Sequence, residues 1–238
     1  MSRLIILSAV LLALAAACAG NEDDPLEADA FRLPWTADEA WFLVAGPHCD
    51  SSAEICPAGA ARYALDFAPR APLTGFLCAP SANDDYWVTA AAAGVVRIAD
   101  RSLVEVEHGD GLRTGYYHLR SSSLAVAPGD FVEAGAPLGN PSCEHRRGGA
   151  VPGPHVHFYF CATDDATAAC LDDRSSLLAA EGRTLSGWRI QAAEKNYSGS
   201  LTHGDETRTA TALNCSAADP ASDCAGVRND VTPRQDGR

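Results

Sequence analysis

The stretch Gly153-Pro154-His155-Val156-His157-Phe158-Tyr159-Phe160 predicts a β-strand near the middle of the chain. Its aromatic and β-branched residues favour strands, and Gly-Pro marks the start. Since strand side chains alternate between faces, His155 and His157 are expected on one face, about 6–7 Å apart, with Val156 and Phe158 facing a core. Two such histidines are either a metal-binding pair, because imidazole is a common zinc ligand, or an exposed or hydrogen-bonded pair.

Length and charge limit the class of protein. The chain has 238 residues, 47% of them hydrophobic, which suits one domain with its own core or at most two small ones. Its formal net charge is −13, which argues against binding nucleic acid through phosphate contacts. No nucleic-acid partner is therefore expected.

The N-terminus indicates export. Arg3 precedes an apolar run over residues 4–17, which is too short to span a bilayer but typical of a signal peptide. The run ends in residues 15–20, Ala-Ala-Ala-Cys-Ala-Gly, which resemble a lipobox with Cys18 as the lipidated residue. Ordinary signal cleavage after Ala17 is the alternative. We expect an outer-membrane, periplasmic or cell-surface lipoprotein held to the membrane through Cys18, or else a secreted protein.

The cysteine count agrees with an oxidising compartment. There are nine cysteines, and assigning Cys18 to lipid leaves eight, which can pair fully. Nearness in sequence predicts three short disulfides and one long link: Cys49–Cys56, Cys161–Cys170, Cys215–Cys224 and Cys78–Cys143. A zinc–thiolate site is disfavoured because no Cys-x-x-Cys spacing occurs.

The pattern of short strands and turns predicts a mainly β, antiparallel domain with long loops and little helix. Expected strands cover residues 41–44, 62–67, 94–98, 103–107 and 113–119, with the last two forming a hairpin. One helix is expected over 173–181, and from about residue 207 the chain is expected to be a polar loop.

Two more residues are candidate ligands. His48 follows Gly46-Pro47, which is expected to hold it on a turn. Asp66 lies between Leu65 and Phe67 in an apolar strand, where a carboxylate needs a partner, either a metal or an arginine. Two histidines and one carboxylate with an open position are the pattern of a catalytic zinc. The residue types alone leave open whether His155 or His157 is the third ligand.

In this order, four pieces of the sequence resemble the M23 zinc metallopeptidases of the LasA, lysostaphin and β-lytic type, the LytM-like domain. They are Gly46-Pro47-His48, Leu65-Asp66-Phe67, residues 114–119 (Thr-Gly-Tyr-Tyr-His-Leu) and residues 153–158. The segment over 126–135 and the stretches 186–190 and 196–199 also resemble parts of this family. The resemblance covers roughly residues 40 to 205.

The resemblance implies roles for particular residues. His48, Asp66 and His157 would be the metal ligands of one Zn²⁺, and His118 and His155 the catalytic pair. Tyr117 would be a possible oxyanion donor. As strand neighbours, however, Tyr117 and His118 should face opposite ways. His108, His145 and His203 are expected to be surface residues rather than ligands.

The resemblance also implies a function and a division of the chain. The function is a zinc metalloendopeptidase, a cell-wall hydrolase cutting peptidoglycan cross-bridges or glycine-rich peptides. The alternative is a non-catalytic envelope lipoprotein that regulates or binds zinc or glycan. The expected parts are a signal peptide (1–17), lipidated Cys18 with an acidic tether (18–30), the M23-like domain (31–206) and a polar tail (207–238).

Overall fold

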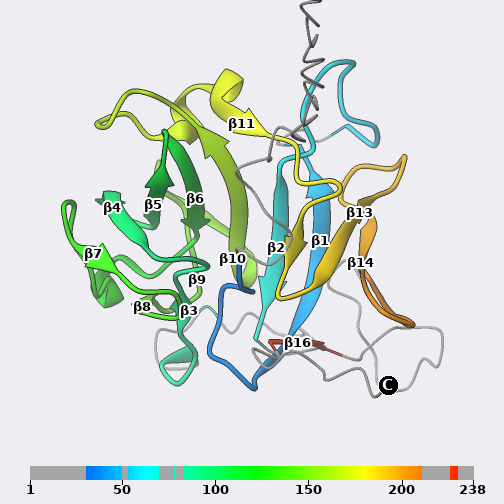
Figure 1. Cartoon of the computed structure of the whole chain (residues 1–238), viewed down its shortest axis with the longest axis horizontal. Helices are drawn as coiled ribbons and strands as arrows, with labels where there is room; N and C mark the ends of the chain where they lie inside the picture. Colours follow the sequence, from blue (N-terminus) through cyan, green and yellow to red (C-terminus); the bar gives the residue numbers. More distant parts are fainter. Residues whose placement is uncertain (1–30, 50–52, 70–77, 79–82, 211–225, 230–238) are drawn as a thin grey trace, which may run out of the picture.

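The computed structural model describes residues 31–49, 53–69, 78, 83–210 and 226–229 (Figure 1). The signal peptide, the lipobox with Cys18, the acidic tether and the Cys215–Cys224 pairing were predicted for residues outside this part of the chain. Over the described ranges, no helix is both long enough and apolar enough to cross a membrane.

The fold is mainly β with antiparallel strand pairs, as the sequence predicts. The largest sheet has ten strands in the order β16-β1-β2-β10-β6-β5-β4-β7, and β9 and β11 also pair with β10. The bounds of these strands are β1 (Ala40–His48), β2 (Ala64–Ala68), β4 (Gly94–Asp100), β5 (Leu103–Gly109), β6 (Leu112–Tyr117), β7 (Phe131–Val132), β9 (Ser142–Glu144), β10 (Ala150–Ala162), β11 (Leu177–Leu178) and β16 (Val227–Arg228).

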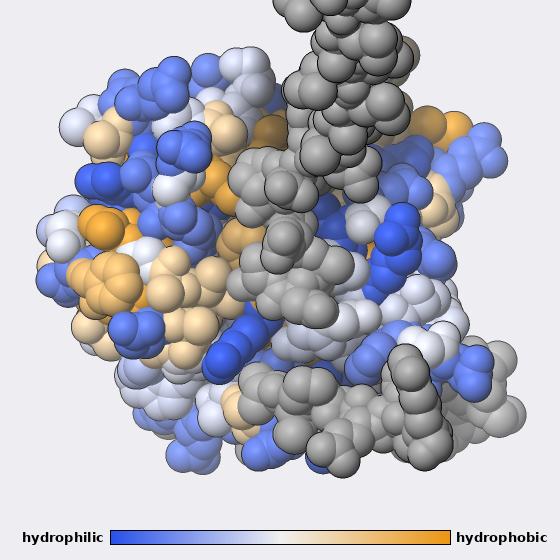
Figure 2. Space-filling model, in the orientation of Figure 1, coloured by the Kyte–Doolittle hydropathy of each residue, from blue (hydrophilic) through white to orange (hydrophobic). Residues whose placement is uncertain are grey.

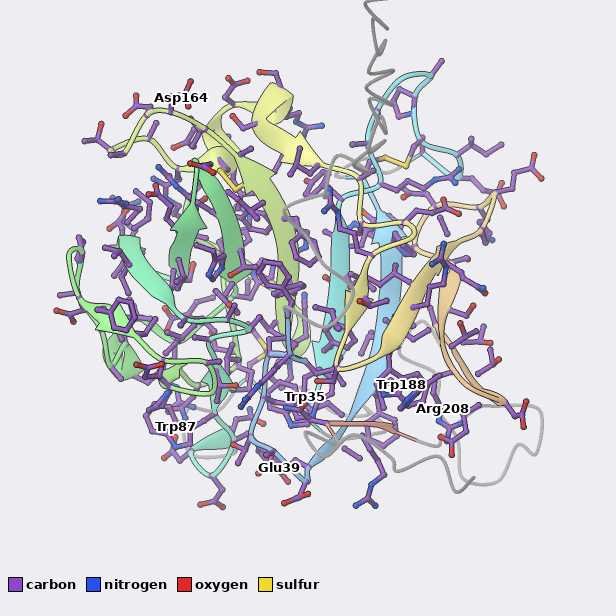
Figure 3. The ribbon with its side chains drawn as sticks, viewed as in Figure 1. Trp35, Glu39, Trp87, Asp164, Trp188 and Arg208 are labelled. Atoms are coloured by element: carbon purple, nitrogen blue, oxygen red, sulfur yellow. A yellow bond between two sulfur atoms is a disulfide. The ribbon has the colours of Figure 1, made fainter. Side chains whose placement is uncertain are left out.

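Two smaller sheets accompany the largest sheet within the described ranges. One has four strands, β12 (Thr184–Leu185), β13 (Trp188–Ala192), β14 (Gly199–His203) and β15 (Glu206–Thr209), and the other pairs β3 (Val88–Thr89) with β8 (Pro137–Gly139). In Figure 1 the strands β13 and β14 lie beside β1. Figure 3 labels Trp188 and Arg208 in this sheet, where the guanidinium carbon lies 5.8 Å from the indole centroid.

The core lies against one face of β10. Val156, Phe158 and Phe160 are fully buried in the main apolar cluster, which confirms the predicted face opposite the histidines. Trp35 and Trp41 stack in the same cluster, with ring centroids 5.3 Å apart and planes 2° apart (Figure 3 labels Trp35). Burying each large apolar side chain stabilises the fold by about 1.5–3 kcal/mol. This core fixes β10, and β10 in turn positions the histidines.

The surface drawn in Figure 2 is mostly hydrophilic over the described residues, in keeping with the acidic composition. Hydrophobic residues gather at the left of that view, in the region of β7. Phe131 in this strand is 64% exposed. Single exposed aromatic side chains of this kind are common on soluble domains and need no partner to explain them.

The predicted helix over 173–181 is wrong. That segment contains the 3-10 turn η4 (Arg174–Ser176) and then β11, and the turn η3 (Cys170–Asp172) precedes it. Leu177 is buried and pairs with Cys161 of β10, so sheet pairing prevails over the weak helical propensity of the segment. The short 3-10 helix η2 (Ser121–Ser123) lies between β6 and β7.

Strand structure also extends past residue 206, where a loop was expected. Residues 206–209 form β15, which pairs with β14, and β16 pairs with β1. The residues of β15 alternate between half-buried and exposed positions, so all four can be polar. A polar edge strand of this kind is difficult to distinguish from a loop in the sequence. The predicted domain boundaries remain predictions.

Candidate metal centre

The centre is built on β10 and its two neighbours. His157 pairs with Asp66 of β2 on one side and with Tyr117 of β6 on the other. His155 lies two residues earlier, opposite Ser142 of β9. The ring of His118 lies 4.8 Å from that of His155 and 5.9 Å from that of His157 between centroids. The predicted shared face of His155 and His157 is therefore confirmed.

His48 reaches the centre from the end of β1. The expected turn at His48 is absent, because β1 continues through Gly46-Pro47 to His48, with register shifts against β2. Gly46 permits this path because its φ is +136° and a Cβ there would lie 2.9 Å from the Leu65 Cα. The irregular pairing brings His48 towards Asp66.

His48, Asp66 and His157 bring one potential ligand atom each to a common point. These three atoms lie within 4.8 Å of one another. Asp66 Oδ1 is 3.2 Å from His48 Nε2 and 3.1 Å from His157 Nδ1. Asp66 is therefore partnered by histidines and not by an arginine, which was one alternative from the sequence.

The donor set fits a zinc ion. Zinc ligands lie about 2.0–2.1 Å from the metal, so neighbouring ligand atoms of a tetrahedral site are about 3.3 Å apart. The two distances to Asp66 Oδ1 are close to that value. Three protein ligands of this kind leave one position open for water or substrate.

Charge at the centre favours a cation. Burial alone would raise the pKa of Asp66, but the surrounding His48, His155 and His157 lower that pKa well below its usual range. The carboxylate is therefore ionised at neutral pH and is only 9% exposed. A buried carboxylate facing two imidazole nitrogens can be neutralised by a bound cation.

His118 and His155 are fixed through their Nδ1 atoms. His118 Nδ1 lies 2.8 Å from the carbonyl oxygen of Glu144, and His155 Nδ1 lies 3.0 Å from that of Gly153. Because a carbonyl oxygen only accepts, each Nδ1 carries the proton and each Nε2 is the acceptor. His155 Nε2 is 3.9 Å from Asp66 Oδ1.

Both histidines are kept neutral by their surroundings. Burial lowers the pKa of His118 well below 6.5, and neighbouring His155 and His157 lower it further. Burial also lowers the pKa of His155, although Asp66 opposes the shift. Neutral imidazoles with an accepting Nε2 can take a proton from a nearby water.

Tyr117 and His118 share a side of the sheet, contrary to the expectation from strand alternation. Their rings stack, with centroids 4.0 Å apart and planes 26° apart. The alternation fails because His118 lies beyond the end of β6 with a φ of +67°. The hydroxyl oxygen of Tyr117 accepts a hydrogen bond of 2.9 Å from the backbone N–H of Arg146.

Three residues at the centre were missed or misplaced from the sequence. Tyr63 precedes β2, and its ring lies against the rings of His48 and His157. Tyr197, with a φ of +62°, stacks on His48 at 4.4 Å. His145, expected at the surface, is half-buried, with its ring centroid 6.0 Å from that of His118.

The other two histidines lie elsewhere. His108 is half-buried in the hairpin region, where its ring nitrogens lie 2.8 Å from the carbonyl oxygen of Ala93 and 2.8 Å from the hydroxyl of Thr114. His203 packs against Trp188. These contacts give His108 and His203 structural surroundings that sequence patterning did not indicate.

Three of the predicted disulfides are present: Cys49–Cys56, Cys78–Cys143 and Cys161–Cys170. Cys49 follows His48 directly, and its backbone N–H donates to Asn196 Oδ1. Asn196 precedes Tyr197, whose ring lies on His48. The first disulfide and Asn196 thus fix the chain beside His48.

Comparison with known proteins shows which family part of this chain resembles. Residues 74–168 match the model of Peptidase family M23. Protease LasA of Pseudomonas aeruginosa is 32% identical over 116 residues, which are 47% of this chain and 25% of that protein. Beta-lytic metalloendopeptidase of Achromobacter lyticus is 30% identical over 115 residues, 47% of this chain and 27% of that protein.

A solved structure agrees with these matches. The deep-sea M23 metalloprotease pseudoalterin superposes with a TM-score of 0.58 at 25% identity, covering 76% of this chain and 94% of that one. The chain is thus similar to Peptidase family M23 over residues 74–168, and to Protease LasA and Beta-lytic metalloendopeptidase over just under half of its length. It spans only about a quarter of the length of those two curated relatives. The family match includes His118, His155 and His157 but begins after His48 and Asp66.

Proposed function

We propose that this protein is a zinc metalloendopeptidase that hydrolyses peptide bonds in peptidoglycan cross-bridges or in glycine-rich peptides. One observation carries the proposal: His48 Nε2, Asp66 Oδ1 and His157 Nδ1 converge beside two further buried histidines. The M23 match and the names of its relatives, a protease and a metalloendopeptidase, support the peptidase class.

His48, Asp66 and His157 would hold the ion. Zinc at this point would supply Lewis acidity, which polarises the scissile carbonyl and lowers the pKa of a water towards about 7. The carboxylate of Asp66 offsets part of the cationic charge, and the two imidazoles leave the site open on one side. The set is unlike a closed structural site, which would use a fourth protein ligand.

His118 and His155 would move the protons. Each donates from Nδ1 to a backbone carbonyl, so its orientation is fixed and Nε2 faces inward as an acceptor. One of the two can take the proton from the attacking water and the other can give a proton to the leaving amine. Their position beside Asp66 and His157 supports this role, because a water bound at the ion would lie near both.

The substrate and location are part of the proposal. Glycine-rich or peptidoglycan peptides follow from the M23 resemblance, and export follows from residues 1–20 of the sequence. Attachment of Cys18 to lipid would place the enzyme at the envelope, next to its substrate. Signal cleavage after Ala17 would release it instead.

The test is hydrolysis of pentaglycine and of purified peptidoglycan, with and without a chelator. We expect chelator-sensitive cleavage by the wild type that zinc restores. His155→Ala should reduce it by about 10²–10⁴-fold while zinc stays bound. His203→Ala, a histidine outside the centre, is the matched control and should leave cleavage unchanged.

Two outcomes would count against this function. Wild-type protein without zinc would overturn the metal site. Protein with one zinc and no cleavage of either substrate would favour the alternative of a non-catalytic regulator or a zinc- or glycan-binding module at the envelope.

A further inference from the structure

His157 differs from His118 and His155 in the hydrogen bonding of its ring nitrogens. His118 and His155 each donate to a backbone carbonyl. His157 faces Asp66 through Nδ1, and its Nε2 is buried with no hydrogen-bond partner among the described residues. A histidine metal ligand almost always fixes its ring by donating from the other nitrogen. Something else must orient His157.

Three tyrosine rings surround it. The ring centroid of His157 lies 5.9 Å from that of Tyr63, 6.0 Å from that of Tyr159 and 6.1 Å from that of Tyr117. The ring planes are inclined by 71°, 60° and 88°, so these are edge contacts within the range that stabilises aromatic pairs. All three tyrosines are buried.

Tyr159 is the most firmly held of the three. Its hydroxyl donates to Glu105 Oε1 at 2.6 Å, and Glu105 is fully buried. Glu105 also accepts from Arg113 at 3.2 Å and from the backbone N–H of Cys170 at 2.8 Å. On β6, Gly115 leaves room for the Tyr159 ring, since a Cβ there would collide with it.

Tyr117 is held as well. Its hydroxyl accepts from the backbone N–H of Arg146, and its ring stacks on His118. The hydroxyls of Tyr117 and Tyr159 therefore have partners other than His157, and both rings make edge contacts with the His157 ring. Aromatic edge contacts are each worth about 0.5–1.5 kcal/mol in general, enough in combination to restrain a ring.

We propose that Tyr63, Tyr117 and Tyr159 form an aromatic enclosure that orients His157 for metal binding in place of the usual hydrogen bond, with Glu105 anchoring the enclosure through Tyr159. The three tyrosines are positioning residues, because they act through the ligand and not on the substrate. The inference rests on the proposed zinc site.

The first test is zinc affinity, measured by competition with a chromogenic chelator. Tyr63→Leu removes one aromatic ring of the enclosure and should weaken zinc binding by about tenfold. That is the lower end of the loss in metal affinity when a residue that orients a ligand is removed. Tyr63→Phe keeps the ring and should bind zinc within about threefold of wild type. Tyr86→Leu is the control, because this half-buried tyrosine packs on Trp41; it should bind zinc like wild type.

The second test needs no variant. In the zinc-loaded wild type, nitrogen-15 NMR of the histidine side chains should show a protonated, exchange-protected Nε2 on His157. Its proton should resonate upfield of the Nδ1 proton of His118, which is hydrogen-bonded to Glu144. A His157 proton as far downfield as that of His118 would reveal a hydrogen-bond acceptor and overturn the enclosure.

The two proposals fail in different ways. Wild-type protein that binds no zinc would overturn the proposed function. Wild-type protein that binds zinc tightly, together with a folded Tyr63→Leu variant of unchanged affinity, would overturn the enclosure alone. If Tyr63→Leu does not fold, the position of the His157 proton decides.

Discussion

Among the residues that the structure describes, two groups of potential ligands include residues of β10, and the first suits a metal better than the second. His48, Asp66 and His157 form the first; Glu105, Cys161 and Cys170 form the second, and in each the three atoms lie within 4.8 Å of one another. In the second group the sulfurs are joined in a disulfide and the carboxylate already accepts from three donors.

The two groups are equally compact, and they differ in whether their polar atoms already have hydrogen-bond partners. The Glu105 carboxylate is matched by Tyr159, Arg113 and a backbone N–H, so the group is closed. At the first group, Asp66 meets two imidazole nitrogens at distances that suit ligands around an ion. Buried residues of ligating type become a metal site only where their lone pairs are still available.

The largest effect should come from removing a ligand of the first group. His157→Ala should reduce bound zinc from one per chain to near zero. Peptide hydrolysis should fall by at least about 10³-fold, because a catalytic metal would contribute several kcal/mol to the proposed reaction. Metal analysis after gel filtration measures the zinc. The double variant Cys161→Ser with Cys170→Ser should retain it; loss of zinc there would mean that the second group takes part.

Replacing His118, the catalytic candidate at the end of β6, should lower the rate of hydrolysis without removing zinc. His118→Ala should lower kcat by about 10²–10⁴-fold, because a proton acceptor beside the reacting atoms is lost. Zinc content should stay at one per chain, since His118 is not among the three converging atoms. Steady-state kinetics and metal analysis on one preparation show whether activity is lost without zinc. If zinc is lost together with activity, His118 is a ligand.

Replacing Glu105 of the second group should lower the stability of the fold more than it lowers zinc affinity. Glu105→Ala removes the nearer of two carboxylates from the fully buried Arg113 and leaves it only Glu107, at 3.7 Å. This loss should lower the free energy of unfolding by about 3 kcal/mol, the lower end for breaking a buried ion pair. Denaturant titration measures it, with Glu105→Gln as the milder variant that still offers an oxygen to Tyr159. A Glu105→Ala protein as stable as wild type would show that water reaches Arg113 and replaces the lost carboxylate.

The two short disulfides offer a matched comparison. Cys49–Cys56 and Cys161–Cys170 span 7 and 9 residues, so removing either by paired Cys→Ser substitution should cost about 2–3 kcal/mol of stability. Only loss of the first should also weaken zinc binding, because Cys49 adjoins His48. Equal zinc affinity in both double variants would remove the role assigned to the first disulfide.

The smallest effect is expected at Tyr117. Tyr117→Phe keeps the ring that stacks on His118 and loses only the hydroxyl bonded to Arg146, so kcat should change by less than about threefold. If the hydroxyl instead stabilised an oxyanion, the loss would be about 10²-fold or more. Single-substrate kinetics distinguish the two.

Local patterns in the sequence predicted the parts of the fold that depend on neighbours in the chain. The period of two along β10 placed His155 and His157 on one face and Val156 and Phe158 in the core. Turn signals predicted the hairpin of β5 and β6. Cysteine spacing predicted the three disulfides within the described residues.

What the sequence missed depends on breaks in regular structure. Alternation failed at His118 and could not place Tyr197, because both have a positive φ. Tyr63 lies one residue before β2, outside the alternation of that strand. The meeting of His48 with Asp66 requires irregular pairing of β1 with β2, which no local pattern specifies. Their residue types suggested a shared site, and the choice of His157 as the third ligand came from resemblance to the M23 family.

X-ray absorption at the zinc edge of the purified protein tests the central claim most directly. The account predicts one zinc per chain with nitrogen and oxygen ligands at about 2.0–2.1 Å and no sulfur, as His48, Asp66 and His157 require. A zinc–sulfur distance of about 2.3 Å would move the metal to the second group, and no bound zinc would contradict the account altogether.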